Sequence, residues 1–346
     1  MELKIAEETD QQNWDAIVER SPNATIFHTW KWLKLMEKYS TIQNSGIGSR
    51  VKFYPLFLME KDRPVGIYPL FFLKKLIFNF TYSPPPNMET LYLGPLFPDI
   101  ETMKEEKKQI FIIDVQKEID RFIKKDLKST CIQVNTPPGF EDCRSFKWGG
   151  YSTIPRYTYY INLNDGKEKI WDNFSRTLKQ DINKVKKKGI HVDIGSKKDV
   201  KFIYDFHKER NRIRSNKEYM LEIFDNFAPK NLTVFIAKHE NSSLSGVITI
   251  CYKNKVSFWV GTPRLSYDGT SPNTYIYWEA INWAIENGYE IFEIMGADEV
   301  TLFPFKRKFN GKIIPYYQMK WMSPSLNVIS SLYHSLIKGD DNQLDV

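Results

Sequence analysis

Apolar positions in the first half of the chain are spaced first for a helix and then for strands. Residues 29–38 form a predicted helix with one apolar face, because its large side chains recur at steps of three and four. Extended segments at 51–60 and 65–73 flank a short polar turn and predict a hairpin. A helix over 104–128 and a strand over 131–134 follow. The predicted order is strand, turn, strand, helix, strand.

The second half repeats this order. Strands are predicted over 232–237 and 246–252, with a polar turn between them. A helix over 275–286 ends at an Asn-Gly pair, and a strand over 290–295 comes next.

Glycines mark the repeat. Gly66 and Gly246 hold the same place in the two predicted hairpins, 180 residues apart. The agreement predicts a duplicated unit that contains helices and strands, with a boundary near residues 149–155.

One predicted helix, over 167–188, is strongly amphipathic. Its apolar stripe consists of Ile170, Phe174, Leu178, Ile182 and Val185. Its other faces carry Arg176, Lys179, Lys184, Lys186, Lys187 and Lys188. Two interpretations stay open: a solvated face whose last lysines complement the helix dipole, or a surface that faces the phosphates of a nucleotide, coenzyme or RNA.

Composition narrows the class of protein. Hydrophobic residues make up 42% and charged residues 26% of 346, so the chain can bury a large core and is not disordered overall. Lysine and arginine number 49 against 42 acidic residues, which favours phosphate-bearing partners. Cys131, Cys143 and Cys251 lie far apart, so neither a disulfide framework nor a zinc site is indicated.

The apolar runs also fail as membrane spans. Lys74 and Lys75 interrupt one of the longest, and about 20 apolar residues are needed for a helix to cross a bilayer. The N-terminus is acidic and polar, unlike a secretory signal. We therefore expect a protein located in the cytoplasm, with contact to the inner face of the membrane if its substrate is lipid-linked.

Several kinds of catalytic site are absent from the sequence. It contains no G-x-S-x-G nucleophile motif, and its five histidines lack the spacing of metal ligands, so we expect no metal. The string at 43–48 matches the Q-x-x-G-x-G pyrophosphate loop of acetyltransferases. A predicted strand follows it instead of the helix that such a loop requires, which indicates a chance match.

An ordered set of segments is spread along the chain. The set comprises Phe27-His-Thr-Trp-Lys-Trp32, Leu93-Gly-Pro95, Trp171-Asp-Asn-Phe-Ser175 with the basic helix, His207-Lys-Glu-Arg210, Trp278-Glu-Ala280, Gly288, Met295-Gly296 and Phe305-Lys-Arg-Lys-Phe309. This set resembles the FemAB family of peptidoglycan interpeptide-bridge aminoacyltransferases and related acyltransferase domains of the GNAT superfamily. It extends from about Trp14 to Trp321.

The resemblance implies an α/β (α+β) fold of tandem GNAT-like acyltransferase domains, each a mixed twisted sheet flanked by helices. The domains are expected at 1–152 and 153–322, the second with the basic helix 167–188. A C-terminal helix and tail are expected over 323–346. The compact chain lacks the long charged coiled-coil arm of several family members.

The family also implies a reaction. An amine attacks the ester or thioester carbonyl of an activated donor, so the enzyme orients two substrates, accepts a proton and stabilises an oxyanion. The expected donor is aminoacyl-tRNA, with acyl-coenzyme A as the alternative, and no tightly bound cofactor is needed. The expected acceptor is an amine of a cell-wall or cell-surface precursor, handled by a monomer.

Residue roles follow from the same resemblance. Lys306 matches the family's Phe-Lys motif lysine near the transferred acyl group, and Asp99 and Asp298 are candidate catalytic carboxylates, with Glu299 as an alternative. Candidate substrate-binding residues are Lys34, Trp32, Arg210 and Tyr275, with Arg212 and Arg214 competing for the role of Arg210. Candidate donor-binding residues are Lys306, Arg307, Lys308, Lys184 and Lys187.

A different class of function also fits the residues. A non-catalytic protein could use the basic helix to bind nucleic acid or an anionic surface. Binding of that kind weakens steeply with salt because condensed counterions are released.

Overall fold

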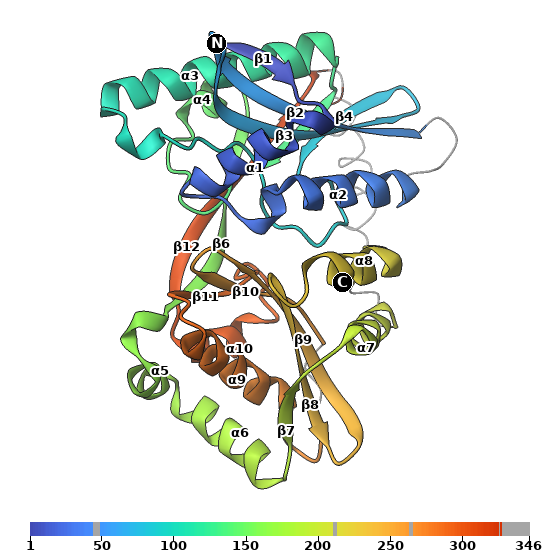
Figure 1. Ribbon diagram of the computed structural model, residues 1–346, viewed down its shortest axis with the longest axis vertical. Helices are drawn as coiled ribbons and strands as arrows, with labels where there is room; N and C mark the ends of the chain where they lie inside the picture. The colour runs from blue at the N-terminus through green and yellow to red at the C-terminus, as the bar shows by residue number, and fades with distance from the viewer. Residues whose placement is uncertain (44–48, 210–212, 263–265, 325, 327–346) are drawn as a thin grey trace, which may run out of the picture.

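The described strands form one mixed sheet that runs through both halves of the chain. A computed structural model describes residues 1–43, 49–209, 213–262, 266–324 and 326 (Figure 1). Among these residues the strand order is β1-β2-β3-β4-β5-β12-β6-β11-β10-β9-β8-β7. The strands are β1 (Glu2–Ile5), β2 (Ser49–Glu60), β3 (Arg63–Lys75), β4 (Phe78–Ser83), β5 (Cys131–Asn135), β6 (Ser152–Asn162), β7 (His191–Ile194), β8 (Leu232–His239), β9 (Ser242–Tyr252), β10 (Lys255–Gly261), β11 (Ile291–Ile294) and β12 (Lys312–Met322).

Helices cover both faces of this sheet (Figure 1). They are α1 (Gln11–Arg20), α2 (Trp30–Gln43), α3 (Glu105–Arg121), α4 (Arg144–Trp148), α5 (Lys167–Asn173), α6 (Arg176–Lys187), α7 (Lys197–Lys208), α8 (Lys217–Phe227), α9 (Pro272–Glu286) and α10 (Phe303–Lys306). Strand residues alternate between the faces: Phe57 packs with α1 and α2, whereas Leu56 and Leu58 pack with α3. In the second half α7 and α8 cover one face and α5, α6 and α9 cover the other.

Each half contains the same unit of three antiparallel strands, a helix and a strand. The units are β2-β3-β4-α3-β5 and β8-β9-β10-α9-β11. In both, the last strand pairs in parallel with the third strand, which gives the described sheet its parallel pairs β4–β5 and β10–β11. The sequence pattern missed β4 and β10, although the remaining order agrees with the structure.

Gly66 and Gly246 are equivalent in these units for a steric reason. A Cβ on Gly66 would lie 2.7 Å from the Leu96 carbonyl oxygen, and one on Gly246 would lie 2.8 Å from Ile203 of α7. Both distances are below van der Waals contact, so a segment crosses each hairpin too closely for a side chain.

The end of the chain returns to the first half. β12 pairs with β6 over Lys312–Lys320 and with β5 over Gln318–Met322. It therefore joins the two units into a continuous sheet, and the predicted division between residues 152 and 153 falls at the start of β6, inside that sheet.

The predicted single helix over 167–188 is wrong, because two helices occupy this range. Phe174 adopts an extended conformation, and the Ser175 side chain accepts a hydrogen bond from Leu178 N to cap α6. Ser175 N donates to the Lys308 carbonyl oxygen at 2.9 Å. The apolar stripe continues across the break, which is why spacing alone could not detect it.

Two other predicted helices differ from expectation or lie largely outside the structure. The helix predicted over 104–128 is α-helical only to Arg121, and a π-helical segment, Phe122–Asp126, follows. Most of the helix predicted in 323–346 lies outside the described residues. Every helix in the described part of the chain is too short or too polar to cross a lipid bilayer.

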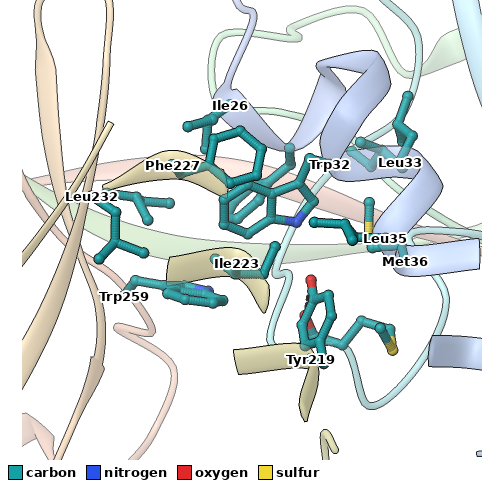
Figure 2. Close-up of a cluster of buried hydrophobic side chains, with 14 of the residues drawn as sticks. Ile26, Trp32, Leu33, Leu35, Met36, Tyr219, Ile223, Phe227, Leu232 and Trp259 are labelled. Carbon is teal, nitrogen blue, oxygen red and sulfur yellow. Dashed lines mark hydrogen bonds between the residues drawn. The ribbon is translucent and has the colours of Figure 1, made fainter. Parts of the chain in front are cut away.

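An aromatic core joins the two halves. Figure 2 shows Trp32 of α2 packed against Phe227 of α8 and Trp259 of β10, with ring centroids 4.8 and 5.3 Å away. Trp32 is 0% exposed. Because α2 and α8 belong to different halves, the halves bury apolar surface against each other and are held in a fixed relation.

A buried polar cluster lies at the same junction. Glu293 of β11, 0% exposed, accepts hydrogen bonds from Tyr92 of the first half and from Thr158 and Ser257 at 2.8 Å. Lys255 Nζ lies 3.0 Å from the same carboxylate. Burial alone would lower the pKa of Lys255, but Glu293 and the Tyr160 hydroxyl together hold this pKa above its usual range. Every one of these groups has a partner, as buried polar groups require.

Candidate active site

A cavity opens where β10 and β11 separate. These strands pair in parallel from Lys255 and Ile291 to Phe258 and Ile294, and the register of β10 with β9 then shifts between Phe258 and Val260. The space beyond has a volume of about 640 Å³. It is lined by Trp259 to Thr262 of one strand end, Met295 and Gly296 of the other, α10, and Glu89 and Leu91 from the first half. Such a crevice at strand ends is a common location for ligands.

Lys306 projects into this cavity from α10. The aromatic rings of Phe305 and Phe309 lie 5.1 and 4.9 Å from Tyr277 and anchor the short helix on the core. The Lys306 ammonium donates to the carbonyl oxygens of Met295 and, at 2.6 Å, Gly296. The two buried phenylalanines, Phe305 and Phe309, thus fix the position of Lys306.

The environment of Lys306 changes its acid–base behaviour. The residue is 6% exposed. Burial lowers its pKa to about 8, and the carboxylates of Glu299 and Asp298 limit the fall. An ammonium group has three donors, and two are used by carbonyl oxygens. The third can bind an oxyanion that develops in the cavity.

Carboxylates face the cavity from both halves. Glu299 and Glu89 line it. Asp298 instead accepts a hydrogen bond from Tyr157 N at 3.1 Å and lies 3.7 Å from Arg156. Of the adjacent acidic pair, the structure therefore brings Glu299 to the cavity, whereas Asp298 is engaged at its edge.

Asn273 and His207 also line the cavity. Asn273, in the first turn of α9, donates to the Thr262 carbonyl oxygen at 3.0 Å, and its own buried side-chain oxygen has no partner in the described structure. His207 Nε2 contacts the Gly261 carbonyl oxygen. A hydroxyl or amine of a bound molecule would satisfy the Asn273 oxygen, which otherwise carries a desolvation cost.

Other predicted site residues lie away from this cavity. Trp32 belongs to the buried core, and Lys34 pairs with Glu8 and Glu37 at 3.0 and 2.6 Å. Asp99 pairs with Arg63 at 2.5 Å. Trp32, Lys34 and Asp99 therefore do not line this cavity, and their predicted substrate-binding or catalytic roles stay predictions.

The remaining predicted residues do not line this cavity or lie outside the described residues. Tyr275 is half-buried, and the Lys186 ammonium lies 4.9 Å from the centroid of the Tyr275 ring. Lys308 donates to Asp181 at 3.2 Å, and Arg307 lies 5.8 Å from the Phe303 ring. Lys184 and Lys187 are exposed on α6. Arg210 and Arg212 are outside the described residues, and Arg214 is exposed near Glu89.

Glu89, Asn273 and His207 line the cavity but were not named as site residues from the sequence. Glu89 follows Pro84-Pro85-Pro86 in a segment without periodicity, and Asn273 and His207 lie more than 60 residues apart. Glu89 has a left-handed backbone, with φ of 48°, which is unusual for a residue other than glycine. Nothing in the local sequence of an isolated glutamate signals such a conformation.

Comparison with known proteins agrees with this geometry. Residues 172–307 match the family model of an acetyltransferase (GNAT) domain. No curated protein matches the sequence. Among solved structures, that of FemX is similar with a TM-score of 0.67 and 14% identity, covering 94% of this chain and 98% of that one.

Two further structures share the fold. L-PGS from Bacillus licheniformis has a TM-score of 0.53 at 14% identity, covering 97% of this chain and 98% of its own. A conserved protein of unknown function from Bacteroides thetaiotaomicron has a TM-score of 0.54 at 11% identity, covering 93% and 99%. The predicted tandem GNAT-like fold is confirmed, because the second half matches a GNAT domain model and nearly the whole chain shares the fold of FemX.

Proposed function

We propose that this acyltransferase moves an aminoacyl group from a charged tRNA to an amine of a cell-wall or cell-surface precursor. The observation that carries the proposal is Lys306, a buried ammonium in the cavity between β10 and β11. The transferred carbonyl would lie beside Lys306, whose third donor stabilises the oxyanion of the tetrahedral intermediate.

The lining of the cavity supports an aminoacyl donor. An aminoacyl group carries an α-ammonium, and the carboxylate of Glu299 together with the unpartnered oxygen of Asn273 offers acceptors for it. A simple acyl group has no such donor to offer. The exposed Lys184 and Lys187 on α6 add a basic surface on the same half, which suits the phosphates of a tRNA.

Acyl-coenzyme A is the second candidate donor. The match to an acetyltransferase domain favours it, and the cavity borders the N-terminus of α9, a position that suits a phosphate group. The acceptor would be the same kind of amine. The chain would work in the cytoplasm, at the membrane when the acceptor is lipid-linked.

A transfer assay separates the two donors. Labelled aminoacyl-tRNA and labelled acyl-coenzyme A would each be offered to amine acceptors, including a nucleotide-linked cell-wall peptide, and acid-stable label in product would be counted. Lys306→Ala should lower kcat by about 100- to 1,000-fold, the usual effect of losing one oxyanion donor. Lys117→Ala, an exposed site on α3, is the matched control. Transfer from coenzyme A alone would replace the tRNA proposal, and an active Lys306→Ala enzyme would refute the role of Lys306.

The pH profile provides a second test of Lys306. The protonated form is the donor, so kcat should fall as pH rises through about 8. Arginine stays charged throughout this range. If Lys306→Arg is active, its kcat should therefore not decrease as pH rises through about 8. Identical alkaline limbs in the two enzymes would show that another group titrates.

A further inference from the structure

Two cavities share lining residues. Besides the donor cavity of about 640 Å³, a smaller one of about 300 Å³ lies in the first half. Residues 84–91 line it together with Gln133, Asn135 and Arg214. Glu89 and Leu91 line both cavities. A transferase must bring two substrates together at one point, and the shared residues mark such a point.

Glu89 is held in place by contacts from the second half. Its backbone carbonyl accepts a hydrogen bond from Trp259 Nε1 of β10 at 2.5 Å. Its side-chain Oε1 accepts from Arg214 N and Ser215 N, both at 3.2 Å. A residue with φ of 48° needs surrounding structure to maintain it, and these three bonds supply it.

Tyr92 fixes the other end of this segment. Its hydroxyl donates to both oxygens of buried Glu293, at 3.0 and 2.8 Å, and Asn135 donates to the Leu91 carbonyl oxygen at 2.7 Å. Glu89 is therefore carried on a segment tied to both halves of the sheet. A carboxylate offers about four acceptor positions, so capacity remains after the two backbone bonds.

We propose that the 300 Å³ cavity receives the acceptor as a primary amine on a slender chain, and that Glu89 binds and deprotonates it. This inference rests on the proposed function. Glu89 takes one proton from the ammonium, and the neutral nitrogen attacks the donor carbonyl. As the C–N bond forms and the C–O bond to the ribose breaks, the second proton passes to the departing oxygen. Glu89 then releases its proton to solvent.

The first test is Glu89→Gln, compared with the exposed Glu218→Gln on α8. Glutamine keeps an oxygen for Arg214 N and Ser215 N, so the segment stays in place while the base is lost. We expect kcat/KM for an alkylamine acceptor to fall about 100-fold, within the range for general-base catalysis, and the control to be unchanged.

A second acceptor separates catalysis from structure. An aminooxy acceptor has a nitrogen that is already neutral at pH 7 and needs no base, so Glu89→Gln should use it at nearly the wild-type rate. A variant damaged only in folding would lose both acceptors equally. Full activity of Glu89→Gln with the alkylamine, or equal loss with both acceptors, would overturn the role of Glu89.

Filling the smaller cavity tests its occupant. Gln133→Trp places a large ring among its lining residues, and we expect KM for the amine to rise at least tenfold with donor binding unchanged. An unchanged KM would refute the assignment of this cavity. If Gln133→Trp leaves KM unchanged while Lys306→Ala still abolishes transfer, only the acceptor cavity is refuted and the proposed function is retained. Absence of transfer by the wild-type chain from either donor would refute the function itself.

Discussion

Titration of Lys306 should make the free energy of unfolding of this protein depend on pH. Replacing Lys306 with methionine should remove that contribution. Burial lowers the pKa of Lys306 from its ordinary value of 10.5 to about 8 in the folded chain. Between these values the unfolded chain holds a proton that the folded chain has lost. Wild-type stability should therefore rise with pH through this window, relative to a variant without the amine.

The magnitude follows from the two pKa values. At about 1.4 kcal/mol per pH unit, the difference between 10.5 and about 8 corresponds to about 3 kcal/mol. Lys306→Met keeps much of the side-chain volume and removes the charge. It also leaves the carbonyl oxygens of Met295 and Gly296 without this donor, at a cost of about 1 to 3 kcal/mol that does not vary with pH.

The assay is urea unfolding of both proteins at intervals from pH 7 to pH 10.5. The free energy of unfolding of the wild type minus that of Lys306→Met should be constant below pH 8 and then increase by up to about 3 kcal/mol. Subtraction cancels the other groups that titrate in this range. Lys117→Met controls for the loss of one positive charge. A difference that stays flat to pH 10.5 would refute the buried environment of Lys306.

Three other predictions concern the junction and the basic surface. Trp32→Ala should cost about 3 to 5 kcal/mol in urea unfolding, because a fully buried ring between the halves is lost; a cost below 1 kcal/mol would contradict that packing. Glu293→Gln should cost about 3 to 5 kcal/mol by the same measurement, because Lys255 is left buried without its counter-charge. Reversing charge at Lys184 and Lys187 should weaken tRNA binding and reduce its salt slope in filter binding, and an unchanged slope would place the RNA elsewhere.

The family resemblance could single out Lys306 from the sequence because the motif is local. Phe305 and Phe309 lie within four residues of it, so the segment that anchors the lysine and the lysine itself are read together. Glu299 could likewise be named with Asp298 as an alternative. Choosing between two adjacent carboxylates required the structure, because a bond from Tyr157, more than 140 residues away, engages Asp298.

The environment of Trp32, in contrast, could not be predicted from the local sequence. Its spacing in the helix indicated an apolar face, and its place in a family segment suggested substrate contact. The packing partner, Phe227, comes from α8, about 195 residues later, so the sequence near Trp32 could not reveal that the face is covered. The break at Ser175 was hidden in the same way, since the hydrogen bond from Ser175 N goes to Lys308.

The sequence by itself determined the repeated order of helices and strands, because periodicity and turn residues lie in neighbouring positions. A compact motif also singled out Lys306, through its resemblance to the FemAB family. Only the tertiary structure decided that β12 closes the sheet between the halves and that Glu89 meets the cavity of Lys306. Those relations depend on residues more than 150 positions apart, which the burial of a shared core and sheet hydrogen bonds bring together.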